Sequence, residues 1–320
     1  MEYRTVGRSG LVVSEIGLGS WLTLGSSVDR QATRELVTRA FDLGINFFDT
    51  ADVYSNGQAE EALGAALREI PRRYVVLGTK CFFPMSERPN DRGLSRKHIV
   101  ESVEDSLRRL GTDYIDLMQC HRADPDTPIE ETVRAFDDLV RQGKVLYWGL
   151  SEWSPAQIVG ACRTAELLDC VGPISNQPQY NLLRRDIERE VIPVCQRGGL
   201  SQLVFSPLAQ GALTGKYSGG QKPSGSRAAD SARNVFMSAF LEESALEVAD
   251  RLAPLADELG LSRAQLALAW CLHERNVSSA IVGVTRVSQL EDNVKASGLA
   301  LPDEMLERID AIAPRRARKG

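Results

Sequence analysis

The stretch GINFFDTADVY, residues 44–54, places a short apolar segment directly before an acid, Asp49, and a phenol, Tyr54. Two later apolar stretches end in a similar way, one in Lys80 and the other in His121. In a barrel of alternating strands and helices, the carboxyl ends of all strands meet at one opening, where the active sites of such barrels lie. The sequence therefore predicts that an acid, a phenol, an amine and an imidazole face one another.

The apolar pattern along the chain predicts a regular alternation of strands and helices. Strand patterns fall at about residues 15–19, 45–49, 74–80, 114–120, 145–150, 173–177, 201–205 and 279–283. Amphipathic helix patterns fall at about residues 30–43, 58–69, 95–110, 129–142, 154–168, 185–197, 241–259 and 287–297. Eight of each is the number expected for a closed (β/α)8 barrel, or TIM barrel. Two short runs at 3–6 and 11–14 predict a β-hairpin ahead of it.

Residues at the ends of several predicted helices support these boundaries. Ser95 and Ser154 precede two helices and are of a residue type that caps helix amino ends. Pro155 then occupies a first helical position, which suits its fixed φ angle. Glycines suited to left-handed caps follow three other helices, at Gly44, Gly111 and Gly143.

The composition indicates one globular domain that spans residues 1–320. With 43% hydrophobic residues, the chain can bury a large core, and barrels of this type often exceed about 250 residues. The formal net charge of −5 offers no basic field that would attract nucleic acid or an anionic membrane. No run approaches the roughly 18 apolar residues of a membrane span, and the first residues lack the basic start followed by an apolar core that is typical of a secretion signal. We therefore expect a cytoplasmic protein without nucleic-acid or membrane partners.

The six cysteines and three histidines do not suggest a metal or disulfide framework. No CxxC pair occurs, and most of the cysteines lie in apolar strand or helix patterns, so we expect buried free thiols. We expect no metal site, because the spacing typical of zinc ligands is missing.

One stretch, residues 210–240, interrupts the alternation. It follows the seventh predicted strand and is rich in Gly, Ser and Ala. A long segment without regular structure inside a compact domain is usually either a functional loop or disordered. Its place in the chain puts it at the barrel opening, so we predict a loop or lid over a ligand, with a disordered insertion as the alternative.

The four residues at the predicted opening have the chemistry that carbonyl reduction needs. The reaction requires a hydride at carbon, which a cofactor supplies, and a proton at oxygen, for which Tyr54 is the natural donor. A free phenol has a pKa of about 10, and the charge of Lys80 would lower it. Asp49 would hold the ammonium in place, and His121 would donate a hydrogen bond to the substrate oxygen.

Each of these residues also has an ordinary structural explanation. Asp49 could cap a turn, Tyr54 could be a half-buried loop aromatic, and Lys80 could be a solvated strand end. His121 could be a core histidine with satisfied hydrogen bonds. The convergence of all four on one barrel opening favours the catalytic interpretation.

Residues 44–54, with Lys80 and His121 at the next strand ends, resemble the aldo-keto reductase family. Further strings are similar to the branch that contains potassium-channel beta subunits and their bacterial relatives, at residues 92–99, 127–132, 147–149 and 206–209. The resemblance covers nearly the whole chain. It implies a (β/α)8 barrel that binds a nicotinamide cofactor, usually NADPH, without a Rossmann domain. The absence of GxGxxG and GxxxxGK[ST] motifs is consistent with that architecture.

The resemblance also implies a set of cofactor contacts. On the first six strands and their loops, the matching residues are Ser20, Trp21, Asp49, Ser151, Asn176 and Gln177. On the last two strands and their loops, they are Phe205, Ser206, Leu208, Gln210, Lys216, Arg227, Gly283, Thr285, Arg286, Gln289, Asp292 and Asn293. Lys216 and Arg227 can offset pyrophosphate charge. Thr285, Arg286 and Gln289 favour NADPH over NADH, because they match the contacts to the 2′-phosphate and adenosine.

Three of these positions depart from the family pattern. Phe205 stands where the family commonly has Tyr or Trp, and its aromatic face can stack on the nicotinamide equally well. Asp292 replaces the usual Glu, which shortens its reach toward the adenine amine. Gly283 replaces a lysine found in other branches, which leaves more of the phosphate selectivity to Arg286.

The substrate side carries fewer signals. Trp21 and Phe83 lie near strand ends and could form an apolar wall beside Tyr54 and His121. No arginine is clearly dedicated to a substrate carboxylate. The sequence therefore favours aldehydes and ketones of low polarity, including aromatic ones.

Two kinds of function are compatible with the resemblance. One is an NADPH-dependent reductase with Tyr54 as general acid, and the other is an NADPH-binding regulatory or redox-sensing subunit of a membrane protein. Animal channel beta subunits typically carry Asn at the position of His121, so the histidine found here favours the reductase. The branch often forms tetramers or larger rings, and a homo-oligomer is compatible with the sequence without being specified by it.

Overall fold

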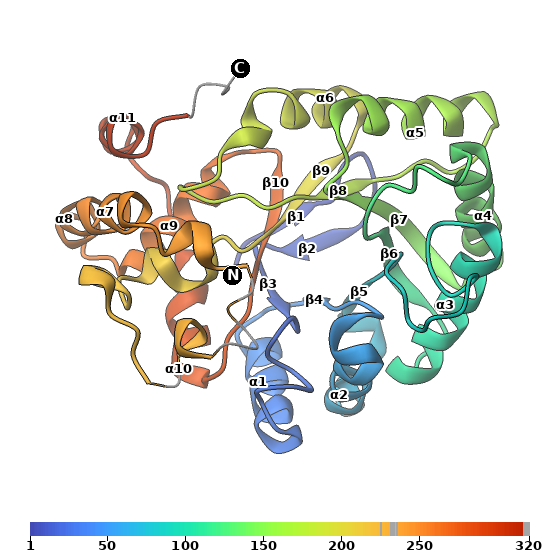
Figure 1. Ribbon diagram of the computed structural model, residues 1–320, viewed down its shortest axis with the longest axis horizontal. Helices are drawn as coiled ribbons and strands as arrows, with labels where there is room; N and C mark the ends of the chain where they lie inside the picture. Colours follow the sequence, from blue (N-terminus) through green and yellow to red (C-terminus); the bar gives the residue numbers. More distant parts are fainter. Residues whose placement is uncertain (225, 231–233, 235, 316–320) are drawn as a thin grey trace.

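Eight parallel strands form a closed barrel with helices packed around it (Figure 1). The computed structural model describes residues 1–224, 226–230, 234 and 236–315. The barrel strands are β3 (Ile16–Gly19), β4 (Phe47–Asp49), β5 (Val76–Cys81), β6 (Ile115–Cys120), β7 (Val145–Ser151), β8 (Ser175–Gln177), β9 (Ser201–Phe205) and β10 (Val277–Val282). Because β10 pairs with both β9 and β3, the ring closes and all carboxyl ends reach one opening. The predicted (β/α)8 fold is confirmed.

The first five helices begin and end close to their predicted boundaries. They are α1 (Arg30–Asp42), α2 (Gln58–Leu67), α3 (Arg96–Leu110), α4 (Ile129–Arg141) and α5 (Pro155–Leu167). The Ser95 hydroxyl accepts a hydrogen bond from the His98 backbone N–H at the start of α3. Ile99, Val103 and Leu107 then form the buried face that packs toward the strands.

The later helices differ more from the prediction. α6 (Val191–Gly198) begins late because residues 186–188 form a 3-10 turn. The predicted helix at 241–259 is two helices, α7 (Glu243–Arg251) and α8 (Ala253–Glu258). Pro254, which lacks the N–H needed to continue the first helix, lies in the first turn of the second. α10 (Val287–Asn293) ends in a 3-10 turn at residues 294–296.

Two helices, α9 (Arg263–His273) and α11 (Asp303–Ile312), have no counterpart among the predicted elements. Every residue of α9 from Ala264 to Leu272 is buried, so the helix has no polar face and no apolar stripe to recognise. Its signal is at the amino end, where Ser262 and Gln265 form a capping box. No helix in the described ranges is both long and apolar enough to span a membrane.

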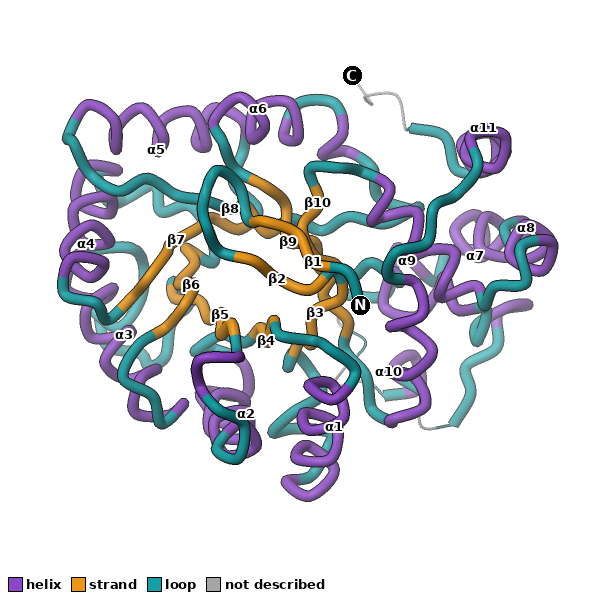
Figure 2. The backbone as a smooth tube through the Cα atoms, turned by 180° about the vertical axis from the view of Figure 1, so that it is seen from behind, coloured by secondary structure: helices purple, strands orange, loops and turns teal. Residues whose placement is uncertain are grey.

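The predicted hairpin is present and lies across the barrel on the side seen in Figure 2. It consists of β1 (Tyr3–Thr5) and β2 (Val12–Ser14), which pair antiparallel. Val6 and Val13 are fully buried with Phe47, Leu117 and Leu203 in one cluster of the barrel strands. Side chains therefore fill this end of the barrel, and space for a ligand remains at the other end.

The sequence predicts no regular structure for residues 210–240, and their described part contains no α-helix or strand but several short 3-10 helices. Tyr217 and Met237 are nonetheless fully buried and belong to the main hydrophobic cluster. This packing anchors the segment on the barrel. Residues 225, 231–233 and 235 of the predicted lid lie outside the described residues.

Candidate active site

A cavity of about 1710 Å³ opens at the carboxyl ends of the barrel strands. Strand ends and the described parts of the loops after β9 and β10 form its walls. Pockets for drug-sized ligands usually measure about 300–1,000 Å³. The cavity is therefore large enough for an extended cofactor together with a small substrate.

A buried ion pair lies in the floor of this opening. The Lys80 ammonium on β5 is 2.6 Å from Asp49 Oδ1 at the end of β4 and 2.7 Å from the Thr50 carbonyl oxygen. Lys80 is 1% exposed and Asp49 is 3% exposed. Burial alone would lower the pKa of Lys80, but Asp49 and Tyr54 outweigh it and hold that pKa above its ordinary value. Lys80 therefore carries a positive charge at neutral pH.

The orientation of Asp49 is fixed by a second strand. Gln177, on β8, donates a hydrogen bond from its side-chain amide to Asp49 Oδ2 at 2.9 Å. The Ser151 hydroxyl donates to the Gln177 backbone carbonyl at 2.9 Å. Both oxygens of the buried carboxylate thus have donors, which is the condition for keeping such a charge inside a protein.

Tyr54 lies in a tight turn, η1 (Tyr54–Gly57), directly after β4. Ser55 adopts a left-handed conformation with φ of 49°, which helps to turn the chain sharply at the rim of the cavity. The Tyr54 ring centroid is 5.1 Å from the Lys80 ammonium and 5.7 Å from the His121 ring centroid. The four side chains predicted from the strand ends therefore lie together.

The phenol of Tyr54 is a weaker acid than the sequence predicts from the nearby charge of Lys80. Burial raises its pKa above the ordinary value, whereas the charge of Lys80 lowers it. The net shift is upward, so the expectation of a lowered pKa is wrong: the cost of burying the phenolate exceeds the attraction of Lys80. Tyr54 keeps its proton at neutral pH and is available as a donor.

His121 is neutral at physiological pH. Burial lowers the pKa of its imidazole well below the ordinary value, and the charges of Lys80 and Arg122 lower it further. Nδ1 is buried and has no hydrogen-bond partner among the described residues. Since a buried N–H without an acceptor is costly, we place the proton on Nε2, which leaves an N–H donor on the side of the cavity.

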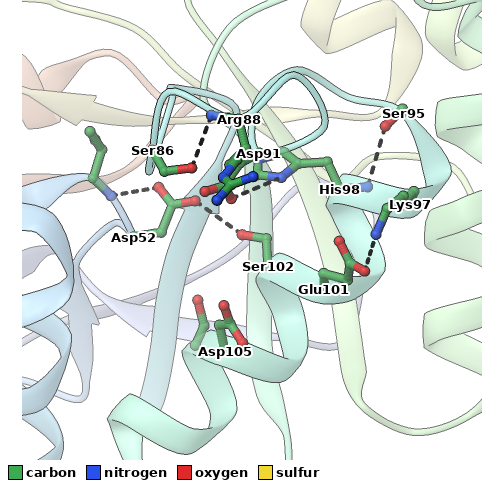
Figure 3. A network of polar contacts seen from close by, with 12 residues as sticks. Asp52, Ser86, Arg88, Asp91, Ser95, Lys97, His98, Glu101, Ser102 and Asp105 are labelled. Atoms are coloured by element: carbon green, nitrogen blue, oxygen red, sulfur yellow. Dashed lines mark hydrogen bonds and ion pairs between the residues drawn. The ribbon is translucent and has the colours of Figure 1, made fainter.

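A second buried carboxyl lies two residues before Tyr54. Asp52 accepts hydrogen bonds from the Val53 backbone N–H at 2.6 Å and from the Ser102 hydroxyl of α3 at 3.0 Å (Figure 3). Burial raises the pKa of Asp52 to about 7, and the nearby charge of Glu60 contributes in the same direction. Asp52 thus connects the turn that carries Tyr54 to the helix behind it.

Most of the predicted cofactor contacts line the cavity. These are Trp21, Asp49, Ser151, Gln177, Phe205, Ser206, Leu208, Gln210, Lys216, Arg227, Gly283, Thr285, Arg286, Gln289, Asp292 and Asn293. Two others are engaged elsewhere: Ser20 donates to the Thr50 hydroxyl at 2.8 Å, and the Asn176 amide donates to Gln202 at 3.2 Å. Successive strand residues point to opposite faces, so a cavity-facing Gln177 turns Asn176 away.

The described part of residues 210–240 reaches Trp21. The guanidinium carbon of Arg227 is 5.5 Å from the Trp21 ring centroid, and the Phe236 ring is 5.6 Å from it. Arg227 also donates a hydrogen bond to the Gln210 side chain. Because the Trp21 and Tyr54 ring centroids are 6.5 Å apart, the segment lies close to the predicted catalytic phenol. Its closure over a ligand stays a prediction.

Asp292 already has partners within the protein. Its carboxylate accepts hydrogen bonds from the Ser262 hydroxyl at 2.7 Å and from the Gln265 amide at 2.6 Å, both at the start of α9. Thr285 and Arg286, by contrast, are exposed at the rim of the cavity. Thr285 and Arg286 are therefore more accessible to an incoming ligand than the Asp292 carboxylate is.

The substrate end of the cavity is partly aromatic. Phe83, which the sequence suggests for this pocket, lies with its ring centroid 4.8 Å from that of His121. Two further wall residues, Arg122 and Phe236, have no clear signal in the sequence. The one hint for Arg122 is its place directly after the strand-end residue His121.

Comparison with known proteins accounts for this arrangement. The sequence model of the Aldo/keto reductase family matches residues 15–314, which include the whole barrel. The chain belongs to the aldo/keto reductase family. Members of this family are generally oxidoreductases that use a nicotinamide cofactor, so the size of the cavity and the cations in its wall are in keeping with the family.

This aldo/keto reductase has relatives that carry the name of channel subunits. A protein of Oryza sativa subsp. japonica, named a probable voltage-gated potassium channel subunit beta, is 44% identical over 100% of this chain and 98% of its own length. A protein of Arabidopsis thaliana with the same name is 45% identical over 98% of this chain and 96% of its own length. The predicted resemblance to the branch with channel beta subunits is confirmed.

Proposed function

We propose that this aldo/keto reductase uses NADPH to reduce aldehydes or ketones to alcohols. The main support is the cluster at the cavity floor, where the Tyr54 ring lies 5.1 Å from the Lys80 ammonium and 5.7 Å from the His121 ring. A bound nicotinamide cofactor would supply the hydride. The protein itself then has to hold the carbonyl and deliver a proton to its oxygen.

The side chains divide that task between them. The neutral His121 donates a hydrogen bond from Nε2 to the carbonyl oxygen and orients it toward Tyr54. As negative charge develops on that oxygen, Tyr54 transfers its phenolic proton to it. The phenolate that remains is stabilised by the Lys80 ammonium, which Asp49 keeps protonated and fixed at 2.6 Å. The raised pKa of the phenol ensures that the proton is present before the reaction begins.

Cations in the wall support a phosphorylated cofactor. Lys216 and Arg227 line the cavity on the segment after β9, and Arg286 lines it before α10. A dinucleotide carries its charge on phosphate groups, for which arginine is a favoured partner because its planar fork matches their geometry. We assign Arg286 and Thr285 to the 2′-phosphate, which makes NADPH the preferred cofactor.

A titration of the purified protein with NADPH and then NADH, followed by intrinsic fluorescence, tests the cofactor assignment. Addition of 4-nitrobenzaldehyde and a panel of other carbonyls, with cofactor absorbance as the readout, tests the reaction. We expect tighter binding of NADPH and carbonyl-dependent oxidation. Tight binding without turnover on any of the carbonyls would contradict the reductase assignment.

The names of the relatives favour a second candidate function. On that account the protein binds NADPH as a regulatory subunit of a membrane channel. His121 favours the reductase, because it completes a proton-donating and hydrogen-bonding site. A pull-down that retrieves a membrane protein, combined with negligible turnover, would make the subunit the better description.

A further inference from the structure

Arg122 brings a positive charge to the substrate end of the cavity. It directly follows His121, lines the cavity and is half-buried. Its guanidinium carbon lies 5.5 Å from the Phe83 ring centroid, and one of its N–H groups donates to the His121 backbone carbonyl. Phe83 in turn contacts the His121 ring edge-on at 4.8 Å. The guanidinium is therefore held beside the imidazole that faces the substrate oxygen.

The field of Arg122 reaches the reacting groups. Burial is the largest cause of the lowered pKa of His121, and the charges of Lys80 and Arg122 lower it further. The pKa of Tyr54 is raised, chiefly by burial, and the charge of Arg122 acts against that rise. Coulomb interactions of this kind fall off with distance and with exposure to water. An anion bound to Arg122 would thus lie close to the carbonyl that Tyr54 protonates.

The other charges near Arg122 are already compensated. Lys80 is paired with Asp49, and Arg184, another arginine that lines the cavity, lies 3.8 Å from Glu152. Asp124, in the same loop between β6 and α4, is used by other donors: it accepts hydrogen bonds from the Leu94 and Asp126 backbone N–H groups and from the Thr127 hydroxyl.

Among the described residues, Arg122 itself forms no ion pair, and its contacts are the His121 carbonyl oxygen and the Phe83 ring. A guanidinium has five N–H donors, and within the described residues only one donation from Arg122 is made, to a backbone carbonyl. A half-buried cation with unused donors at the wall of a substrate cavity is suited to a carboxylate, which it can bind with two parallel hydrogen bonds.

We infer that Arg122 binds a carboxylate of the substrate, so that the preferred substrates are aldehydes or ketones that carry an acidic group. This inference rests on the proposed reductase function and narrows its substrate class. Phe83, Trp21 and Phe236 form aromatic walls around the same space, which suits an aromatic or apolar body between the carbonyl and the carboxylate. The low-polarity substrates expected from the sequence would then be the poorer ones.

Formylbenzoates and their methyl esters give a direct test, because each pair differs in charge while the aldehyde and ring are kept. The three positional isomers cover different distances between aldehyde and carboxylate. We expect the wild-type protein with NADPH to show a kcat/KM at least about 10-fold higher for one acid than for its ester, since hydrogen bonds to charged groups contribute roughly 1.5–3 kcal/mol.

The acid-to-ester ratio of kcat/KM is the readout in the variants, because general damage to the site lowers both rates together. In Arg122→Met the ratio should fall to about one, and Arg122→Lys should keep part of the preference. Arg184→Met is the matched control: it removes another arginine that lines the cavity and that already has a carboxylate partner, and it should leave the ratio unchanged.

The outcomes separate this inference from the proposed function. Turnover of the esters with no preference for any acid, or a preference that survives Arg122→Met, would overturn the role of Arg122 and leave the reductase function standing. If no carbonyl is reduced, the reductase function fails. The anion site is then tested by calorimetric binding of benzoate to the NADPH-saturated protein, and equal affinities of wild type and Arg122→Met would overturn it.

Discussion

The two sides of the cavity are built in different ways. On the side of β4, β5 and β8, charged groups are buried and have partners within the protein, as in the 2.6 Å contact between Lys80 and Asp49. On the side of the loops after β9 and β10, Lys216 and Arg286 are exposed cations on irregular segments. The first side is preorganised for chemistry, because its dipoles and charges need no rearrangement when the reaction occurs. The second is suited to an anionic ligand that neutralises it on binding.

The largest effect is expected from the preorganised side. Tyr54→Phe removes the proton donor and keeps the ring, so NADPH binding should change little while kcat falls by roughly 10²–10⁴-fold, the usual contribution of a positioned acid. Steady-state kinetics with 4-nitrobenzaldehyde measures the change. Undiminished turnover would exclude Tyr54 as the acid and remove the main support for the proposed mechanism.

The loss of unfolding free energy should also differ strongly between a variant of the preorganised side and a variant of the exposed side. Lys80→Met leaves the Asp49 carboxylate buried without its cation, which should lower the free energy of unfolding by roughly 3–5 kcal/mol. The double variant Asp49→Asn/Lys80→Met removes both charges and should recover much of that loss. Lys216→Met is the exposed control and should change stability by less than about 0.5 kcal/mol. Urea unfolding measures all three, and equal losses for Lys80→Met and Lys216→Met would contradict the comparison.

Within the preorganised side, Asp52 differs from Asp49 because Asp52 forms no ion pair with any residue that the structure describes. Burial raises the pKa of Asp52 to about 7 from an ordinary value near 3.8, so between these pH values the folded protein keeps a proton that the unfolded chain releases. The contribution of Asp52 to stability should therefore fall as pH rises from about 4 to 7, by at most about 1.4 kcal/mol per pH unit, and stay level above 7.

The Asp52→Asn variant tests this, because the amide is neutral at every pH and can still bond to Ser102. The decline across the window should disappear, and the variant should be more stable than wild type at pH 8. The exposed Asp113 provides a control, since Asp113→Asn should leave the pH dependence unchanged. If the urea midpoints of wild type and Asp52→Asn change in the same way between pH 4 and 7, Asp52 is ionised in the folded protein and the expected shift of its pKa is wrong.

The contrast between the strand-end side and the loop side of the cavity also explains which parts of the site the sequence could predict. The strand ends that carry Asp49, Lys80 and His121 follow from local apolar runs and from a topology that brings all carboxyl ends together. Asn176 shows where such a prediction fails. Its position matches a cofactor contact of the family, but that match does not show which face of the strand the side chain occupies. Gln177, its neighbour, is the one that contacts Asp49.

Other features depend on long-range packing that a single sequence does not reveal. α9 is buried on all sides and so has no amphipathic pattern. The net upward pKa shift of Tyr54 depends on how completely the fold desolvates the phenol, which outweighs the effect of Lys80. The sequence gives no reason to single out Arg122. Only the assembled cavity shows that, among the described residues, no carboxylate pairs with its guanidinium.

The smallest of these effects concerns the exposed side, where Arg286 is expected to distinguish the two cofactors. Arg286→Ala removes a cation at the rim of the cavity that has no ion-pair partner among the described residues, so the fold should be unaffected. Loss of charge-assisted hydrogen bonds to a 2′-phosphate should weaken NADPH binding by roughly 10-fold or more, while NADH, which lacks that phosphate, should bind almost as before. The NADPH affinity of Arg286→Lys should lie between those of wild type and Arg286→Ala, because lysine offers charge without the planar fork. Fluorescence titrations of wild type and both variants give the six affinities, and equal losses for both cofactors would mean that Arg286 contacts a phosphate they share.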